Sequence, residues 1–543
     1  MAELLAVWVR PEPFDFGICQ IPPPSKLNIS NLHRLAAYAK SKGSQGWPSM
    51  SYCLWSRCAC SKLHMTEDQA QAYFECFRLV WYDHKASETL QWAKSYSRCK
   101  TERERDQLVQ QQVVPVPQFL LFLHIQLSMK ISLKSKLMSD DEWKLVPQAH
   151  DKRAAASKHS SEHTHMDYIS NHLLELVQLL VEPDSYSTAS AAVADQTISG
   201  SSIDALDYLL ACLKLTQSQS RKHVSLREAA QLQSEISHSG YSKITHTFSI
   251  AKLVHWIRSH LTENLYGVSS TITNRHKLAT SSSLHVDGRR KGRMISNLAI
   301  SPNDARLVIL AHIKKLRVMK GEDELAGALV RIQSCREAFV YLLAPMRHVW
   351  IDHCRNCTFI LGAVQGIVHI AHCTHCTVIV MCGQLQIREC TQCVLHSCTP
   401  CKPILQNGND GLMLGPYHTF YPALGQHMIA AGLISEINKW DSPIFTVEDD
   451  EASPSYQLLP HDDFYPFTVP YKMSGDLKEN PCPLPPLYAN ALSKRKRSLE
   501  SWYQALQEAD LDSSQQQQLQ SAVETQFHEW LIQTGNDIQL ANS

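Results

Sequence analysis

The chain has 543 residues, 44% of them apolar, which is typical of a folded protein with about two to four domains. Its 52 lysines and arginines balance its 52 aspartates and glutamates, so no overall positive field favours nucleic acid or an anionic membrane as a partner. No window approaches about 18 uninterrupted apolar residues and no secretory signal is evident, so the 18 cysteines are expected to be reduced thiols of a cytosolic protein.

Apolar residues repeat at helical spacing through residues 1–270. In the clearest case, Leu173, Leu176, Val177 and Leu180 recur at i, i+3, i+4 and i+7, which places them on one face of a helix. Helices are expected after a cap at Asn28 or Ser30, and at 67–82, 88–100, 117–133, 168–181, 203–215, 227–238 and 248–261. This pattern predicts an all-α N-terminal region.

Two polar stretches interrupt this region, at 139–165 and 184–202, and both are predicted to be mobile insertions. The first contains His159, His163 and His165, which are interpreted as solvated side chains in preference to metal ligands. Residues 271–319 are predicted to form a linker. Its basic cluster at 289–293 is interpreted as a solvated charge run, with a localisation signal as the alternative.

A short repeat follows the predicted linker. Cys335, Cys354, Cys373 and Cys390 are spaced by 19, 19 and 17 residues. The same apolar pattern surrounds each: isoleucine three residues before (Ile332, Ile351, Ile370, Ile387), an aliphatic residue five before (Val330, Val349, Val368, Leu385) and an apolar residue five after (Val340, Phe359, Val378, Leu395). Residues two apart share one face of a strand, so each unit is interpreted as two short strands and a corner. Stacking of such units predicts a parallel β-helix at 320–445, with Arg331, Trp350, His369 and Gln386 in an outward-facing column.

The cysteines of this repeat admit two interpretations. They form the C-x-x-C pairs Cys354/Cys357, Cys373/Cys376, Cys390/Cys393 and Cys398/Cys401, a spacing that zinc ribbons also use. Strands with matched apolar positions separate the pairs, however, and cysteine packs well as a small buried residue. The pattern therefore favours structural thiols and no metal site, with zinc binding and redox chemistry as alternatives.

The end of the chain is expected to be irregular and then helical. A helix is predicted at 423–432, a proline-rich segment follows from 449, and helices are predicted at 488–509 and 515–532 within a C-terminal region at 446–543. The chain contains no Walker loop, G-x-G-x-x-G, H-E-x-x-H, G-x-S-x-G or kinase signature in the position its mechanism requires. A binding protein without catalytic residues is therefore expected.

The repeat carries a family resemblance. The segments CRNCTFILGAVQG (354–366), CTHC (373–376) and CGQLQIREC (382–390), with Phe420-Tyr421-Pro422 and Trp440, resemble the tubulin-binding cofactor C domain. Segments PPPSKL (22–27) and FHEWLIQTG (527–535) extend the resemblance over nearly the whole chain to the centrosomal type of cofactor C domain-containing protein. The resemblance implies an α+β multidomain protein with a right-handed parallel β-helix.

In GTPase-activating members of the family, the resemblance implies an arginine finger in the segment C-x-Q-x-R-x-R-x-C. Here that arginine is replaced by Gln386, whereas the next arginine is kept as Arg388. A family glutamate that helps to hold the GTPase corresponds to Gln406, and Gly383 also departs from the active pattern. A neutral amide cannot supply the positive charge of an arginine finger, so GTPase activation by this route is not expected.

The resemblance to the centrosomal type implies a non-enzymatic scaffold of the cytoplasm and cytoskeleton, at the centrosome (the microtubule organising centre) and spindle pole. Its implied roles are centrosome and Golgi positioning, cell shape and cilium assembly. Expected partners are centrosomal or cytoskeletal proteins, with tubulin or a small GTPase bound without activation as a further candidate; no cofactor, nucleic acid or membrane span is expected. The candidate partner face comprises Arg331, Trp350, His369, Gln384, Gln386, Arg388 and Gln406. The alternatives are a GTPase-activating protein that uses Arg388 or Arg347, and a zinc-dependent interaction module.

Overall fold

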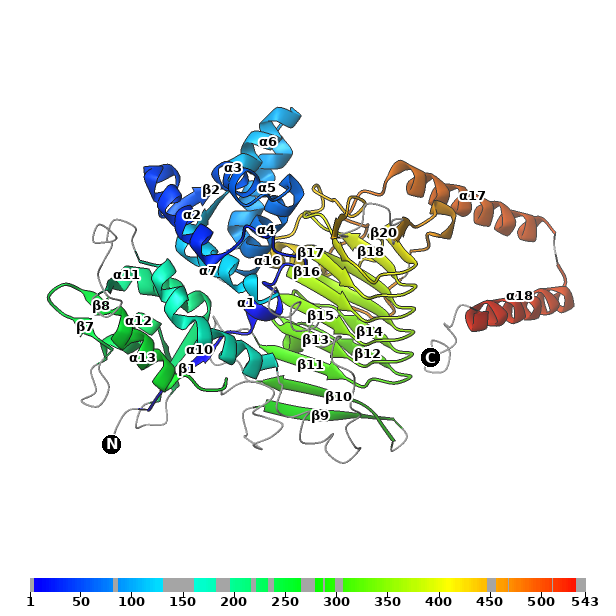
Figure 1. Ribbon diagram of the computed structural model, residues 1–543. Helices are drawn as coiled ribbons and strands as arrows, with labels where there is room; N and C mark the ends of the chain where they lie inside the picture. The colour runs from blue at the N-terminus through cyan, green and yellow to red at the C-terminus, as the bar shows by residue number, and fades with distance from the viewer. Residues whose placement is uncertain are drawn as a thin grey trace, which may run out of the picture. The chain divides into compact units, whose positions relative to one another are not determined.

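The computed structural model describes residues 4–81, 86–129, 161–181, 196–215, 221–232, 239–264, 279–286, 289–297, 306–446, 456–466, 468–509 and 511–533 (Figure 1). The chain divides into two compact units. The N-terminal unit comprises Met1–His84, Ser95–Thr280 and Asn297–Asp304, and the C-terminal unit comprises Lys85–Lys94, Ser281–Ser296 and Ala305–Ser543.

The N-terminal unit packs around one short apolar helix, α7 (Val116–Ile125). Eight of its ten residues are buried, because α7 is apolar on almost all sides and lies against α2 (Ile29–Ser41) and α10 (Ser161–Leu179). The Phe119 ring of α7 packs edge to face on Trp55 of α3 (Tyr52–Lys62), with ring centres 4.8 Å apart. It packs in the same way on Phe77 of α4 (Glu67–Val80), with ring centres 5.2 Å apart. These aromatic contacts hold the helices of the unit together.

The N-terminal unit is helical, as predicted. Its other helices are α1 (Glu12–Asp15), α6 (Glu102–Gln110), α11 (Gly200–Ile203), α12 (Leu226–Gln231) and α13 (Ile250–His260), with 3-10 turns η1 (Gly43–Gln45) and η4 (Asp204–Tyr208). Helix α5 (Ala86–Arg98) contributes residues to both units. The predicted cap at Asn28 is confirmed, since its side chain accepts a hydrogen bond from the Asn31 backbone N–H at 2.9 Å.

The prediction of an all-α N-terminal region is wrong in one respect, because short strands form small sheets between these helices. Strands β1 (Leu4–Val9), β5 (Leu210–Leu215) and β6 (Arg221–Val224) form an antiparallel sheet in the order β1-β5-β6. A second sheet has the order β4-β8-β7 (Thr197–Ser199, Thr247–Ser249, Tyr241–Ser242), and β2 (Ser49–Ser51) pairs with β3 (Val113–Pro115). The helix predicted at 203–215 is wrong beyond residue 208. Residues 210–213 of the central strand β5 form a short apolar run, which periodicity cannot distinguish from part of a buried helix.

Several predicted segments fall partly outside the described residues. Of the polar insertions at 139–165 and 184–202, residues 139–160 and 184–195 lie outside them, and so does His159. The remaining residues begin α10 and form β4 and α11. The last residues of the helices predicted at 67–82, 117–133 and 227–238 also lie outside the described part of the chain.

The C-terminal unit is built on a parallel β-helix, as the repeat predicts (Figure 1). One face stacks β11 (Leu307–Ala311), β13 (Leu329–Gln333), β15 (His348–Asp352), β16 (Thr358–Ala371), β17 (Thr377–Arg388), β19 (Ile404–Gln406) and β21 (Ile444–Thr446). The other stacks β12 (Arg317–Lys320), β14 (Phe339–Leu342), β16, β17, β18 (Val394–Cys398), β20 (Leu412–Pro416) and β22 (Tyr456–Leu458). The long strands β16 and β17 contribute to both faces.

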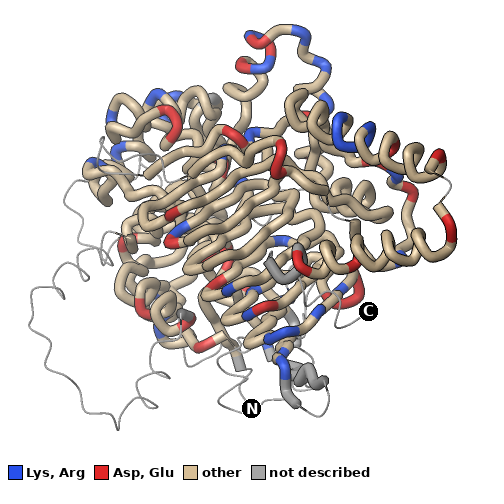
Figure 2. Tube along the Cα trace, turned by 90° about the vertical axis from the view of Figure 1, so that its right-hand side faces the viewer, with Lys and Arg blue, Asp and Glu red and all other residues tan. Residues whose placement is uncertain are grey.

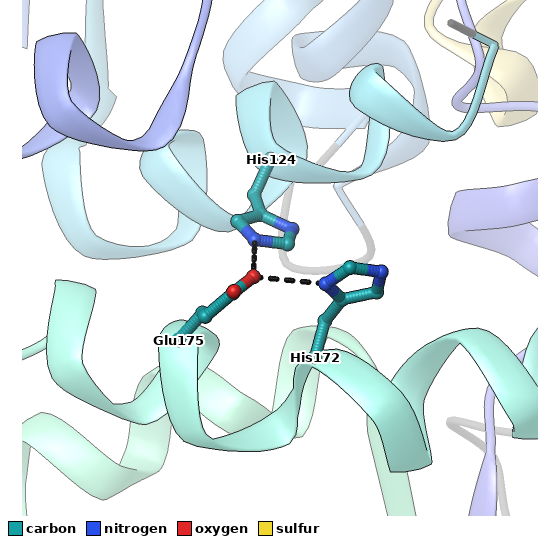
Figure 3. A group of neighbouring side chains, drawn as sticks. All are labelled: His124, His172 and Glu175. Carbon is teal, nitrogen blue, oxygen red and sulfur yellow. Dashed lines mark hydrogen bonds and ion pairs between the residues drawn. The ribbon is translucent and has the colours of Figure 1, made fainter. Parts of the chain in front are cut away.

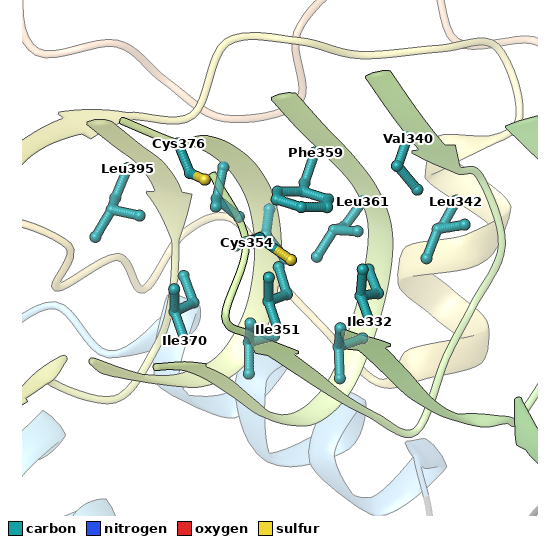
Figure 4. Close-up of a cluster of buried hydrophobic side chains, with 14 of the residues drawn as sticks. Ile332, Val340, Leu342, Ile351, Cys354, Phe359, Leu361, Ile370, Cys376 and Leu395 are labelled. Carbon is teal, nitrogen blue, oxygen red and sulfur yellow. The ribbon is translucent and has the colours of Figure 1, made fainter. Parts of the chain in front are cut away.

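The residues predicted to lie over one another do so in the core. Val330, Val349, Val368 and Leu385 are register partners, and so are Ile332, Ile351, Ile370 and Ile387; all eight side chains are at most 1% exposed. From the opposite face, Val340, Phe359, Val378 and Leu395 complete the same cluster. Figure 4 shows isoleucines of the first face and apolar side chains of the second meeting in the interior.

Each coil turns its corner with two residues in the left-handed conformation. The residue before each column cysteine has a positive φ (Ser334, His353, His372, Glu389), and so does the second residue after it (Glu337, Asn356, His375, Gln392). The next corner uses Gly408 and Gly411 at the equivalent places, and Asn409 stands where the cysteine would be. Asn409 Oδ1 accepts the Cys390 backbone N–H at 2.9 Å, so a polar side chain ends the cysteine column.

Residues 271–319, predicted to form a linker, contain strands instead. Strands β9 (Ala279–Val286) and β10 (Arg289–Asn297) join the β-helix sheet, with β10 antiparallel to β11. Strands β11 and β12 form the adjoining coil, while 271–278 lie outside the described residues. The basic cluster at 289–293 begins β10. Its charges hid the strand in the sequence, although β10 lies between β9 and β11 in the sheet.

Further elements cover the β-helix. Helix α16 (Leu424–Ala431), predicted at 423–432, packs Leu424 and Met428 against Ile360 and Ile379, which point away from the interior. Helix α17 (Pro486–Glu508) places Tyr488 against the main core, and its hydroxyl donates to the Leu459 carbonyl at 2.6 Å. The short helix α15 (Glu322–Leu325), the turn η5 (His461–Asp463) and the predicted final helix α18 (Ser513–Gln533) complete the unit.

Charge and hydropathy agree with the composition. Figure 2 shows basic and acidic residues mixed along the chain, whose totals are equal at 52 each. Among the described residues, no helix is both long and apolar enough to cross a membrane.

Candidate functional site

The face of the β-helix formed by β13, β15, β16, β17 and β19 carries every residue of the candidate partner face. We call "outer face" the side chains of these strands that alternate with the core columns and point away from the interior. Arg331, Trp350, His369 and Gln386 are successive register partners, as predicted. The column continues at Ile404 of β19.

Neighbouring side chains of the outer face contact one another along this column. The Arg331 guanidinium lies 5.6 Å from the centre of the Trp350 ring, a cation–π arrangement. The Trp350 and His369 rings are 5.1 Å apart. Gln386 Nε2 donates to Gln384 Oε1 on the same strand at 2.8 Å, so the amide at the position of the arginine finger is engaged within its own strand.

The residues of the candidate partner face fall into two groups by solvent exposure. This corrects the expectation that every side chain of the outward-facing column can contact a partner. Arg331, Trp350, Arg388 and Gln406 are partly exposed. His369 is 4% exposed, Gln386 1% and Gln384 fully buried. Alternation along a strand determines the direction of a side chain relative to the core, but it does not determine whether that side chain reaches solvent. In this structure Arg388 and Arg331 are therefore the cations of the outer face that reach solvent.

His348 is a residue of this face that the sequence analysis did not single out. It is fully buried, and burial lowers its pKa well below the ordinary value, so the ring is neutral at physiological pH. Its Nδ1 accepts the backbone N–H of Ile367 at 2.9 Å. The hydrogen bond joins β15 to the next coil where β16 changes register, between Val364 and Ile367. The available signal was the separation of 19 residues between His348 and Ile367, which equals the period of the repeat.

The cysteines of the β-helix are placed as buried thiols. In the first column, Cys335, Cys354, Cys373 and Cys390 each donate to the carbonyl of the residue two before, at 3.2–3.5 Å. In the second column, Cys357, Cys376 and Cys393 do the same. Each of these sulfur atoms therefore lies against a backbone carbonyl two residues earlier in the chain, as a buried structural cysteine can. Among the described residues, the two groups of His, Cys, Asp or Glu with ligand atoms within 4.8 Å of one another contain no cysteine.

We expect replacement of Cys354 by alanine to lower the free energy of unfolding by about 1 kcal/mol, because a sulfur atom is lost from a packed core. The zinc content of the protein should not change. Urea denaturation and elemental analysis measure the two quantities. Cys60→Ala, in α3 and only half-buried, is the matched control and should change neither. Loss of a bound zinc ion with Cys354→Ala would instead support the metal interpretation of the C-x-x-C pairs.

Comparison with known proteins now gives the context of this face. Residues 327–444 match the family model described as Tubulin binding cofactor C. The chain is 36% identical over 98% of its length to TBCC domain-containing protein 1 of Bos taurus and of Homo sapiens, covering 96% of each. The chain belongs to the family of TBCC domain-containing proteins. A solved structure, Tubulin Binding Cofactor C from Leishmania major, is similar at 20% identity with a TM-score of 0.20, covering 22% of this chain and 81% of that one.

Membership of the TBCC domain-containing family confirms the resemblance recognised in the repeat. The matched residues run from the coil of β13 to that of β21, and so include the outer face and both cysteine columns. Gln386 thus lies inside the TBCC domain, at the position to which the resemblance assigns the arginine finger of GTPase-activating relatives.

Proposed function

We propose that this protein is a non-enzymatic scaffold of the cytoskeleton. Its site of action is the centrosome and spindle pole, where it contributes to centrosome and Golgi positioning, cell shape and cilium assembly. The family assignment supports a cytoskeletal role, because the matching model is named for tubulin binding. The more specific cellular roles extend this assignment by way of the resemblance to the centrosomal type.

Gln386 is the observation that carries the non-enzymatic part of the proposal. An arginine finger increases phosphoryl transfer by roughly 10³ to 10⁵-fold, through a positive charge at the developing negative charge of the phosphate. Gln386 has no charge, is 1% exposed and uses its Nε2 to bind Gln384. A GTPase docked against the partly exposed residues of the outer face would therefore be bound without activation.

The partner of this face is proposed to be a cytoskeletal or centrosomal protein, with tubulin or a small GTPase as the specific candidate. Arg331 and Arg388 supply positive charge to the exposed part of the face, and Trp350 supplies apolar area between its polar neighbours. Tryptophan and arginine are the residue types that most often dominate protein interfaces. The composition therefore fits a protein surface with carboxylates at its rim.

We expect no acceleration of GTP hydrolysis when this protein is added to tubulin, with or without the other tubulin cofactors, or to a small GTPase of the ADP-ribosylation-factor-like kind. Single-turnover hydrolysis measures the rate. Gln386→Arg alone should restore little, because Gln406 and Gly383 also depart from the active pattern and position 386 is buried.

Arg388 gives the competing function a specific test. It lies on the outer face two residues from Gln386 and is partly exposed, so it is the alternative source of a finger. An acceleration of about 100-fold or more by the wild-type protein, abolished by Arg388→Ala, would replace the scaffold by a GTPase-activating protein. Proximity labelling at the centrosome, with the intact chain and with one lacking 330–445, tests the cellular part of the proposal.

A further inference from the structure

Three side chains of the types that bind metals converge within the N-terminal unit, outside the residues of the TBCC domain. His124 comes from α7, and His172 and Glu175 come from α10, where a spacing of three residues places them on one face of the helix. Glu175 Oε2 lies 2.8 Å from His172 Nδ1 and 3.4 Å from His124 Nε2. Figure 3 shows the carboxylate between the two imidazole rings.

The hydrogen bonds of His124 leave its Nε2 without a donor or acceptor. The Tyr168 hydroxyl is 2.9 Å from the His124 carbonyl oxygen and 3.0 Å from His124 Nδ1. The Tyr168 hydroxyl has one proton, which it donates to the His124 carbonyl oxygen. The contact with His124 Nδ1 must then be an Nδ1–H that donates to the hydroxyl oxygen. With the ring proton on Nδ1, His124 Nε2 carries a lone pair. Nε2 is buried and has no hydrogen-bond partner.

This arrangement brings a lone pair and a carboxylate face to face inside the protein. Two hydrogen-bond acceptors 3.4 Å apart repel one another unless a cation lies between them. In the other tautomer, Nε2–H would be buried with no acceptor in hydrogen-bonding geometry.

We propose that His124 Nε2, His172 Nδ1 and Glu175 Oε2 bind a divalent transition metal, with zinc as the ion that fits best. Zinc takes histidine nitrogen and carboxylate oxygen at about 2.0–2.2 Å, so neighbouring ligand atoms of a tetrahedral site lie about 3.3 Å apart. The 3.4 Å distance from His124 to Glu175 matches this edge. Calcium and magnesium prefer an all-oxygen ligand set, which two imidazoles do not provide.

The surroundings supply what a bound metal requires. Tyr168 accepts from Nδ1–H of His124 and so orients the ring with Nε2 toward the site, as groups behind metal-bound histidines commonly do. His172 is 29% exposed and Glu175 38%, so solvent can deliver the ion and occupy the fourth position. On binding, the proton of His172 Nδ1 moves to its Nε2, and the hydrogen bond to Glu175 is replaced by two bonds to the metal. This site departs from the expectation that the chain holds no metal.

The test measures zinc binding to the purified full chain by elemental analysis and by competition with a chromogenic chelator. About one zinc ion per chain should bind, and His172→Ala and Glu175→Gln should abolish stoichiometric binding while circular dichroism stays unchanged. Tyr168→Phe should weaken binding by roughly 10–100-fold. The matched control is His163→Ala, a histidine of the same helix that is 46% exposed and faces Asp167. It should leave binding unchanged.

Cobalt(II) in place of zinc identifies the ligand type without relying on stability. A site of two imidazoles and one carboxylate should show only visible ligand-field bands, whereas cysteine ligands would add an intense near-ultraviolet charge-transfer band. The thermal midpoint should rise with added zinc in the wild type and not in His172→Ala. Absence of zinc binding, equal binding by His172→Ala and the wild type, or a thiolate band would each overturn the proposal.

Discussion

Replacing Ile351 by aspartate is expected to unfold the β-helix, with a loss of about 3–5 kcal/mol in the free energy of unfolding. Ile351 is fully buried between Ile332 and Ile370 and belongs to the hydrophobic core cluster of the β-helix. The charged side chain must therefore be buried unpaired, or the coil must open. Thermal and urea unfolding followed by circular dichroism measure the effect.

Trp350→Asp is the control for Ile351→Asp, because it places the same side chain one residue away on the opposite side of the strand. Trp350 is partly exposed, and Arg331 beside it can pair with the new carboxylate. We expect a loss of about 1 kcal/mol from the ring contacts with Arg331 and His369. Equal shifts for the two variants would contradict the assignment of inner and outer columns. His369 is a poorer control than its place in the column suggests, since it is only 4% exposed.

Gly366→Ala is expected to lower the free energy of unfolding by about 3 kcal/mol. A Cβ atom at Gly366 would overlap the imidazole of His348 and would lie 2.9 Å from the Arg347 carbonyl oxygen. His348 cannot move without losing the hydrogen bond from Ile367 N–H, and its ring is fully buried. One methyl group thus disturbs the junction between two coils.

Gly321→Ala provides the comparison for Gly366→Ala. A Cβ atom at Gly321 has no atom within 4 Å, and its φ of −115° suits any residue. Its unfolding midpoint should match that of the wild type. A similarly small effect at Gly366 would show that His348 and β16 have room to adjust, contrary to the packing described above.

The core of the β-helix was predictable because its period is written directly in the sequence. A spacing of 19 residues, with isoleucine three before each cysteine, leaves one register in which like residues stack, and Ile351 lies in that register. The corners between the strands were harder to predict from the sequence. Left-handed residues such as His353 and Glu389 have side chains of many types, and glycine marks only the corner at Gly408 and Gly411.

The remaining features depend on contacts between residues distant in sequence. Strand β5 looked helical because side chains on both of its faces are buried, so Leu210, Ala211, Cys212 and Leu213 show no alternation of apolar and polar residues. The burial of Gln386 could not be read from alternation, which gives a direction only. The metal site shows the same limit: His172 and Glu175 have a recognisable spacing, but His124 joins them only when α7 and α10 pack together.

The constant spacing between stacked coils has a consequence for the order in which the C-terminal unit forms. Strands β13 and β15 each pair with a partner 19 residues later, and the second half of β16 pairs with residues of β17 that lie 17 later, so a coil can dock as soon as one further repeat has been synthesised. From β13 to β17, the entropy lost in closing each loop is then small and nearly the same for each coil. We therefore expect folding to advance along the chain in equal steps, with the newest coil offering an open strand edge to the next. That growing edge is the point at which a damaged repeat would stop assembly, leaving the earlier coils folded and the later ones without a template.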